Sequence, residues 1–444
     1  MSKGIPTELG TENVGTLLRK YAVPAIIAMT ASSLYNIVDS IFIGQGVGPY
    51  AISGFAITFP FMNLAAAFGS LIGVGASTLS SVLLGQKDYD NAKRVLGNVV
   101  VLNLIMGGLF SLISLLFLDN ILYFFGASEN TLPYAKEYMV IILAGNIVTH
   151  MYLGLNALLR SSGHPKQAMA ATILTVVLNC ILDPLFIFVF DMGISGAALA
   201  TIISQFVSFC LLYIGCRRGG NISINLRRVK CKSVYFSNIF QGGLPSLVRQ
   251  GLASVATMCL NHAAGIYGDA AIAAISVVQR IMMFGASAMI GFGQGFQPVC
   301  GFNFGARLYD RVRQGFWFCV KSSLGFLTAV SVVLFAFAPT IISWFQSDPA
   351  VVEFGAVALR LQCITFPAQS WIIVSNMMAQ SIGRTVPATF LAAARQGIFL
   401  IPAVLLLPML FNELGLQMAQ AIADGLTLLA SIPIQIYVLK TMER

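Results

Sequence analysis

The sequence predicts an all-α integral membrane protein with twelve transmembrane helices in two six-helix lobes, related by a pseudo-two-fold axis along the membrane normal. Of the 444 residues, 57% are hydrophobic and only 10% are charged, whereas a typical soluble domain has about 25% charged residues. Apolar runs of about 20 or more residues recur along the chain, as expected for transmembrane helices. Alternating basic loops and an internal repeat divide these runs into two equivalent halves.

The twelve predicted helices are separated by joints that contain glycine, proline or charged residues. In the first half they span 21–43, 54–84, 97–118, 134–158, 168–190 and 194–216. In the second half they span 238–264, 271–297, 315–340, 354–380, 386–411 and 415–438. The first 20 residues are polar and lack the short apolar core of a cleavable signal peptide, so we expect the first helix to remain in the membrane.

The basic residues predict one orientation of the chain in the membrane. One set of loops, with the chain ends, carries 20 of the 26 Lys and Arg residues. The opposite loops, at 44–53, 119–133, 191–193, 265–270, 341–353 and 412–414, carry none. By the positive-inside rule, both termini and the loop 217–237 are expected in the cytoplasm. The net charge of +9 is therefore read as a topology signal, and no nucleic-acid partner is expected.

The chain repeats itself at an interval of about 220 residues. GQKDYDNAKR at 85–94 aligns with GARLYDRVRQ at 305–314, and LNALLRSSGHPKQA at 155–168 aligns with SNMMAQSIGRTVPA at 375–388. Duplicated lobes are typical of transporters that expose a central site alternately to the two sides of the membrane. The expected domains are an N-terminal lobe at 1–216, a cytoplasmic basic linker at 217–237 and a C-terminal lobe at 238–444.

Polar residues at membrane depth are costly and indicate a functional site. At about 1.5 Å per residue, Asp39 and Asp183 lie roughly 8 and 10 Å from the outer helix ends, and Thr201 lies at a similar depth. Asn36 and Asn179 lie about one turn from the two aspartates, on the same helix faces. Such oxygens can coordinate Na⁺ at Asp39, Asn179, Asp183 and Thr201, or the two carboxylates can share a proton. The alternative is that each aspartate only braces its own helix.

Two prolines and a set of polar and thioether side chains complete the candidate machinery. Pro24 and Pro184 are candidate hinges because proline removes a backbone hydrogen-bond donor. Candidates for the substrate cavity are Asn156, Met62, Gln279, Arg280, Met283, Asn376, Gln380, Arg249 and Arg395; methionine adapts its shape to varied apolar ligands. The arginines of the second half either bind an anionic group or pair with Asp424. Ordinary packing and internal polar bracing are the alternatives.

Several stretches together resemble one known family. They are VPAIIAMTASSLYNIVDSIFIG in the first helix, LRSSGHPK after the fourth, LNCILDPLFIF in the fifth and GISGAALATIISQ in the sixth. With GFGQGFQPVCGFNFGAR and ARQGIFLIP in the second half, they make the chain similar to the multidrug and toxic compound extrusion (MATE) family of secondary transporters. Within that family it resembles the bacterial subgroup near the staphylococcal multidrug pump.

The resemblance implies a two-lobe exporter driven by entry of Na⁺ or H⁺. It implies a cation site in the first lobe formed by Asp39, Asn179, Asp183 and Thr201, with Tyr138 matching a tyrosine that some relatives use. Some members place an acidic residue in the seventh helix, where this chain has Arg249 and Gln250. A second ion site in the C-terminal lobe is therefore not expected.

The leading hypothesis is a secondary active multidrug exporter that antiports lipophilic or cationic compounds against inward H⁺ or Na⁺. The alternative is a flippase for lipid-linked saccharides, which unpaired arginines in the cavity would favour and pairing within the second lobe would disfavour. An enzyme is not expected, since the sequence has no P-loop for ATP, no zinc-ligand spacing and no nucleophile–base set. We expect a monomer in a bacterial plasma (inner) membrane, with the coupling ion and no cofactor.

Overall fold

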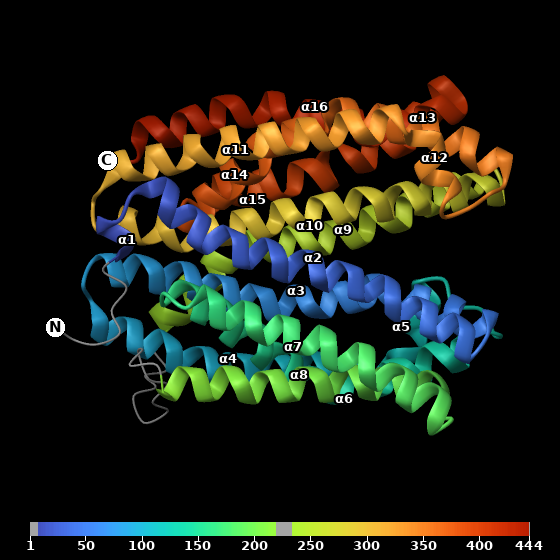
Figure 1. Cartoon of the computed structure of the whole chain (residues 1–444), viewed down its shortest axis with the longest axis horizontal. Helices are drawn as coiled ribbons and strands as arrows, with labels where there is room; N and C mark the ends of the chain where they lie inside the picture. Colours follow the sequence, from blue (N-terminus) through green and yellow to red (C-terminus); the bar gives the residue numbers. More distant parts are fainter. Residues whose placement is uncertain (1–7, 219–232, 444) are drawn as a thin grey trace.

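The computed structural model describes residues 8–218 and 233–443, and within these ranges all regular structure is helical. Figure 1 shows two groups of long helices that lie side by side along the long axis of the molecule. The first group contains α1 (Glu8–Thr11), α2 (Val14–Gly46), α3 (Pro49–Gly85), α4 (Tyr89–Leu116), α5 (Leu118–Phe124), α6 (Leu132–Ser161), α7 (Pro165–Pro184) and α8 (Gly193–Arg218). The second contains α9 (Ser233–Gly265), α10 (Asp269–Gly305), α11 (Tyr309–Ala336), α12 (Ala338–Ser343), α13 (Pro349–Thr365), α14 (Gln369–Ser381), α15 (Thr385–Ala393) and α16 (Leu400–Thr441). These two lobes agree with the predicted fold class.

The two ends of the bundle differ. The N-terminal helix α1 and the C-terminal end of α16 lie at one end, which we call the terminal face, together with the end of α8 and the start of α9 (Figure 1). The short helices α5 and α12 lie at the other end, which we call the opposite face. The predicted linker at 217–237 falls largely outside the described residues.

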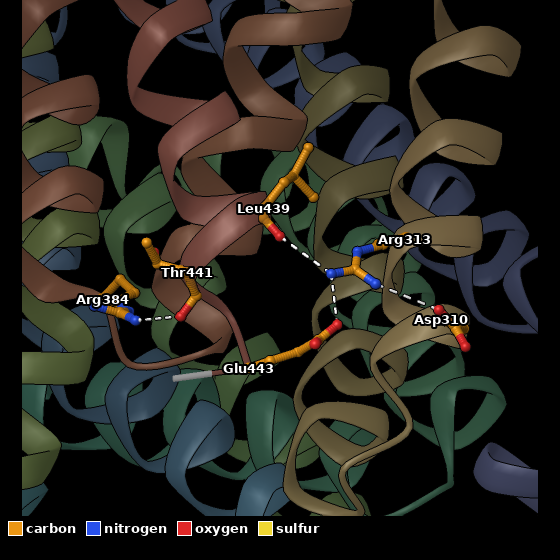
Figure 2. Close-up of polar contacts among 6 residues, drawn as sticks. All are labelled: Asp310, Arg313, Arg384, Leu439, Thr441 and Glu443. Carbon is orange, nitrogen blue, oxygen red and sulfur yellow. Dashed lines mark hydrogen bonds and ion pairs between the residues drawn. The ribbon is translucent and has the colours of Figure 1, made fainter.

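The C-terminal end of α16 is fixed at the terminal face by two arginines (Figure 2). Arg313 on α11 donates to the Leu439 carbonyl oxygen at 3.4 Å and pairs with Glu443 at 2.6 Å. Arg384, in the turn before α15, donates to the Thr441 carbonyl oxygen at 2.9 Å. Because the last carbonyl groups of a helix have no partner within the helix, these bonds satisfy them and hold α16 in the lobe.

The predicted loops at 119–133 and 341–353 are partly helical. The short helix α5 follows a break at Phe117, and α12 follows a break at Phe337. Each buries two apolar residues four apart, Leu118 and Leu122 in α5 and Ala338 and Ile342 in α12. The sequence does not predict these helices, because each is much shorter than an apolar run that could cross a membrane.

The last two predicted helices form one continuous helical segment with a kink. Ten helical segments in the described part of the chain are long and apolar enough to cross a membrane. The predicted spans 386–411 and 415–438 fall within a single one of these segments, Thr385–Thr441. They are joined because α16 continues across a kink at Asn412, which has φ 52° and ψ −133°. The helix α9 is not among them, since Arg249 and Gln250 interrupt its apolar sequence. Splitting α16 at its kink and counting α9 restores twelve spans.

The internal repeat is visible in matching turns and contacts. The α3–α4 turn places Lys87 at φ 62°, and the α10–α11 turn places Arg307 at φ 60°. A Cβ atom on Gly85 would lie 2.0 Å from a carbonyl oxygen of α10, and one on Gly305 would lie 2.1 Å from a carbonyl oxygen of α3. The two glycines therefore make reciprocal contacts across the lobes, as a pseudo-two-fold axis requires.

Other glycines also bring the lobes into backbone contact toward the terminal face. A Cβ atom on Gly243 of α9 would lie 1.7 Å from the Leu71 carbonyl oxygen, and one on Gly75 of α3 would lie 1.9 Å from the Ile239 carbonyl oxygen. On α10, a Cβ atom at Gly295 would lie 2.5 Å from the backbone of α2. No residue with a side chain fits such separations, so the lobes are tightly closed against each other at this end.

Candidate functional site

Three helices of the first lobe bring the predicted acidic and amide residues together. Asp39 lies on α2, Asn179 and Asp183 on α7, and Thr201 on α8. All four are buried: Asp183 is 0% exposed, Asp39 and Asn179 are 1% exposed and Thr201 is 6% exposed. The helix α7 packs between α2 and α8, so its inward face meets side chains from both neighbours.

Hydrogen bonds join these side chains into one cluster. The Tyr35 hydroxyl donates to Asp39 Oδ2 at 3.5 Å and lies 3.1 Å from Thr201 Oγ1. The Asn179 amide has one orientation in which both its oxygen and its nitrogen find partners. In that orientation its N–H groups donate to Asp183 Oδ2 at 2.8 Å and to the Tyr35 hydroxyl oxygen at 3.1 Å. In that orientation the Asn179 oxygen accepts from the Thr201 hydroxyl at 3.2 Å. The neutral groups therefore hold one oxygen of each carboxyl.

The remaining oxygens of the two carboxyl groups define the chemistry of the cluster. Hydrogen bonds through Tyr35 and Asn179 connect the Asp39 and Asp183 carboxyls inside the lobe. The Oδ1 atom of each is buried and receives no hydrogen bond from an N–H or hydroxyl group of the described residues. Two adjacent buried carboxylates repel each other, so one proton between them, or a small cation bound by both, would relieve the repulsion. Oxygen-only sets of this kind suit hard cations.

Tyr35 belongs to the cluster although the sequence analysis did not select it. Its only sequence signal is its position four residues before Asp39, which places both on one helix face. Tyr138, selected through the family resemblance, is fully buried, and its hydroxyl has no hydrogen-bond partner among the described residues. Asn36 is partly exposed, and within the described chain no hydrogen bond joins its amide to the cluster; only its carbonyl oxygen accepts from Ser40, at 2.8 Å.

The two candidate hinge prolines have different surroundings. The helix α2 continues as a single helix through the buried Pro24. At Pro184 the α-helix ends and a π-helical turn follows over Leu185–Val189. Because proline has no N–H to donate, the chain changes its hydrogen-bonding pattern beside Asp183. Turns of this kind are frequent at functional sites.

The acidic residue of the second lobe has a basic partner. Asp424 on α16 pairs with Arg395 at 2.8 Å, and Asp424 is 1% exposed. Gln420 donates to the same Asp424 oxygen at 3.0 Å, and Gln369 donates to the other at 3.4 Å. Arg395 lies in a second π-helical turn, Ala394–Ile398. The arginines were predicted either to bind an anionic group or to pair with Asp424, and Arg395 pairs with Asp424.

Several residues predicted for the substrate cavity make structural hydrogen bonds instead of standing free. Asn156 donates to the Ala168 carbonyl oxygen at 3.0 Å, and its repeat partner Asn376 donates to the Ala388 carbonyl oxygen at 2.6 Å. Both bonds join helices across the same joint of the two lobes. Arg249 donates to the Asn376 oxygen at 3.1 Å, so its nearest partner is neutral and lies in its own lobe.

The other cavity candidates differ in exposure. Gln380 is 1% exposed and donates to the Gly242 carbonyl oxygen at 2.8 Å, whereas Met283 is 39% exposed. Arg280 is exposed, and Gln279 and Met62 are partly buried. Substrate contact by these residues stays a prediction.

A sequence profile of the MatE family matches this chain twice, over residues 24–185 and again over 245–406. The two matches correspond to the two lobes. The chain is 28% identical over 426 residues to the multidrug export protein MepA of Staphylococcus aureus (strain MRSA252), covering 95% of this chain and 93% of that protein. It is 29% identical over 409 residues to the protein of the same name from Staphylococcus haemolyticus, covering 91% and 89% of the two chains.

Solved structures share the fold over its full length. One, described as the outward-facing conformation of a multidrug resistance MATE family transporter, superposes with a TM-score of 0.92 at 24% identity and covers 100% of this chain and 99% of that chain. Another, described as MATE in complex with MaL6, has a TM-score of 0.93 at 24% identity with the same coverage. At this identity the likeness concerns the arrangement of the helices.

Proposed function

Because this chain belongs to the MatE family, we propose that it is a secondary active multidrug exporter that exchanges lipophilic or cationic compounds for inward-moving H⁺ or Na⁺. The observation that carries the proposal is the buried pair of Asp39 and Asp183, which one hydrogen-bond network joins inside the first lobe. The curated relatives named above are multidrug export proteins. The site has the acidic groups that ion coupling requires.

The proposed site for the coupling ion consists of Asp39, Asp183, Asn179 and Thr201, with Tyr35 and Tyr138 around them. While it is ionised, the carboxylate pair attracts a cationic drug bound nearby. Entry of H⁺ or Na⁺ removes the repulsion between the two carboxylates and so favours a different packing of α2 against α7. One charge that crosses 100 mV supplies about 2.3 kcal/mol, enough for a useful coupling of the two movements.

The proposed orientation places the terminal face in the cytoplasm, because the basic loops gather there. Because the lobes are closed against each other at this face, we propose that the binding region of this state is reached from outside. Export then requires the lobes to rock apart at the terminal face and close at the opposite face. In this proposal Pro24 and the π-helical turn after Pro184 are the points at which α2 and α7 bend.

The flippase reading finds less support. Arg395 is neutralised by Asp424 within the second lobe at 2.8 Å, and Arg249 is bound by Asn376 of the same lobe. A pyrophosphate-binding cavity would need such guanidinium groups free. We therefore propose small lipophilic or cationic substrates, with the chain acting as a monomer in a bacterial plasma membrane without ATP.

The test uses Asp39→Asn and Asp183→Asn, which preserve shape and remove the titratable charge. In reconstituted vesicles, ethidium export driven by a Na⁺ gradient or by a pH gradient, imposed separately, should fall to background in both variants. Gel filtration should show that the variants remain folded. Unchanged export by the double variant would reject the proposed coupling site, and the gradient that drives the unsubstituted protein identifies the ion.

A further inference from the structure

We propose that a file of hydroxyl groups inside the first lobe carries the coupling proton from the Asp39–Asp183 pair to the terminal face. The file runs along the inward faces of α7 and α8 and ends on α6. This inference rests on the proposed function with H⁺ as the coupling ion. It assigns transport roles to side chains that the coupling site itself does not include.

The upper part of the file begins at the carboxyl cluster. The Asn179 amide and the Thr201 hydroxyl are 3.2 Å apart, directly beside Asp183. From Thr201, the residues Ser204 and Ser208 follow on one face of α8 at spacings of three and four, so each lies about one turn farther toward the terminal face. Ser204 and Ser208 are both 0% exposed.

Ser204 occupies the critical position in this file. Its hydroxyl oxygen is buried and has no hydrogen-bond partner among the described residues. An unsatisfied buried hydroxyl in a lipid-embedded lobe is costly and calls for an explanation. Along the helix axis it lies roughly 4.5 Å from Thr201 and roughly 6 Å from Ser208, and the proposed file includes water on either side of its hydroxyl group.

The lower part of the file consists of direct hydrogen bonds between helices. Thr175 of α7 donates to Ser208 of α8 at 2.8 Å. Thr172, about one turn below Thr175, accepts from the Tyr152 hydroxyl at 3.2 Å and from the Asn156 amide at 3.1 Å. Polar side chains of α8, α7 and α6 therefore follow one another from the carboxyl pair toward the terminal end of α6.

Simple bracing does not account for this arrangement as well as proton transfer does. The Thr175 and Thr172 hydroxyls can already satisfy themselves on the carbonyl oxygens four residues earlier, at 3.1 and 3.2 Å. Each threonine hydroxyl also contacts a hydroxyl group of a neighbouring helix, Ser208 for Thr175 and Tyr152 for Thr172. A hydroxyl group can both donate and accept a hydrogen bond, which a proton relay needs. A brace would not need an unpaired hydroxyl, such as that of Ser204, in its middle.

The proton balance is straightforward. The carboxyl group releases its proton to a neighbouring oxygen, each hydroxyl or water accepts one proton and passes on another, and the last oxygen delivers one to water at the terminal face. One carboxylate remains, and the hydroxyl groups are unchanged. The ionisable groups near the upper end of the file are Asp39, Asp183, Tyr35, Tyr138 and Cys180. Those near its lower end are Tyr152 and Arg160.

Arg160 marks the exit. Its guanidinium group donates to Gln294 of the second lobe at 2.6 Å, so it is held in place while the lobes are closed at the terminal face. A fixed positive charge opposes the passage of a proton. Proton release should therefore follow the separation of the lobes at this face, which prevents a leak of protons through the closed state.

The experiment uses Ser204→Ala and Thr175→Val, which keep the size of the side chain but remove the hydroxyl. The matched controls in the second lobe are Ser331→Ala, a buried serine whose hydroxyl also lacks a partner, and Thr427→Val, a buried threonine bonded to the Ala423 carbonyl oxygen at 2.7 Å. The full-length proteins are reconstituted into vesicles that contain a pH-sensitive dye. Three rates are measured: ethidium export driven by a pH gradient, the accompanying proton movement, and exchange of labelled for unlabelled ethidium without a gradient.

We expect Ser204→Ala and Thr175→Val to lose at least about tenfold in both export and proton movement, as for loss of a positioned proton-transfer group, and to keep the exchange rate. Exchange requires the lobes to move but no proton to leave, so a general structural defect would lower it as well. Rates equal to those of the two controls, or loss of exchange together with export, would overturn the inference. Export driven by Na⁺ alone would overturn it as well. Failure of the proposed function is distinct, since Asp183→Asn would then export normally.

Discussion

The Asp39 and Asp183 carboxyl groups limit the charge that the interior of the first lobe can hold. Both are essentially inaccessible to solvent, and the groups around them are neutral amides and hydroxyls. Such groups stabilise one negative charge well and two poorly. A proton or a small cation therefore changes the local energy more than any rearrangement of neutral side chains could, which makes this pair a suitable point of coupling.

Tyr35 should change the affinity of the Asp39–Asp183 pair for the coupling ion without being essential for export. Its hydroxyl contacts Asp39, Thr201 and the Asn179 amide. Tyr35→Phe removes all three contacts, and the one to the Asp39 carboxyl is worth about 1 kcal/mol. A hydrogen bond donated to a carboxylate favours its charged form, so we expect half-maximal export at a roughly fivefold lower H⁺ concentration if H⁺ is the coupling ion, with the maximal rate little changed. Titration of the export rate against ion concentration measures this. A complete loss of export would contradict the prediction and make Tyr35 as important as the aspartates.

Arg395 is expected to matter for stability. Because Asp424 is buried and Arg395 is its charged partner, Arg395→Leu leaves an uncompensated buried charge and should cost about 3–5 kcal/mol. The double variant Arg395→Leu/Asp424→Leu should recover most of that loss. Thermal unfolding of the purified variants in detergent provides the measurement. Equal destabilisation by the single and double variants would show that the pair is not the source of the effect.

The residues of the site differ in how clearly the sequence marks them. Asp39 and Asp183 stand out because charged residues are rare in transmembrane helices. Tyr35 does not, since tyrosine is common in apolar segments, and only its distance from Asp39 distinguishes it. Arg249, Arg280 and Arg395 looked alike in sequence, yet only Arg395 has an acidic partner in the structure. Pairing between helices distant in the chain cannot be read from local sequence.

The four-residue helix α1 is bonded to helices of the second lobe. Its Leu9 is fully buried, and the Leu9 carbonyl oxygen accepts from Asn303 at 2.9 Å and from Arg311 at 3.2 Å. Arg311 also donates to the Glu12 carbonyl oxygen at 2.6 Å. The segment before α2 is thus bonded to α10 and α11 of the other lobe, at the face where the lobes are closed.

Loss of these bonds should ease opening at the terminal face. We expect Asn303→Ala/Arg311→Ala to increase the labelling of a single cysteine introduced at Gln294 several-fold, since each lost hydrogen bond is worth about 1 kcal/mol. Labelling with a membrane-impermeant thiol reagent, in a background without the eight native cysteines, measures this. Arg313→Ala, which affects only contacts inside the second lobe, serves as the control. Equal labelling of both variants would show that α1 does not stabilise the closed face.

Helix boundaries could be predicted where the amino-acid composition changes, but changes of backbone hydrogen-bonding pattern inside a helix could not. The glycine and basic joints marked the ends of α3 and α6 to within three residues, because turns and water-exposed charges interrupt apolar sequence there, whereas α10 continues to Gly305, beyond its predicted end at 297. The π-helical turns at Leu185–Val189 and Ala394–Ile398 were not predicted as such. Pro184 gave a signal of backbone irregularity for the first, whereas the second contains no proline.

For the whole molecule, the number of lobes and the repeat could be derived from sequence, but the conformation could not. Identical sequence patterns serve both states of a rocking transporter, because the same helices remain in each lobe. What identifies the present state is backbone contact across the lobes, such as Gly75 against Ile239 and Gly243 against Leu71. A glycine in a membrane helix gives no indication of which partner approaches it.

A disulfide across this contact should arrest the molecule in one state. The Thr78 Oγ1 atom lies 3.0 Å from the position that a Cβ atom on Gly242 would occupy, close to the roughly 3 Å between a disulfide sulfur and the far Cβ atom. In the cysteine-free background, Thr78→Cys/Gly242→Cys should stop ethidium export on oxidation and regain it on reduction, because the closed face can no longer open. Each single cysteine variant is the control. Continued export by the fully oxidised protein would mean that α3 and α9 stay together throughout transport, and that the lobes do not rock apart at the terminal face.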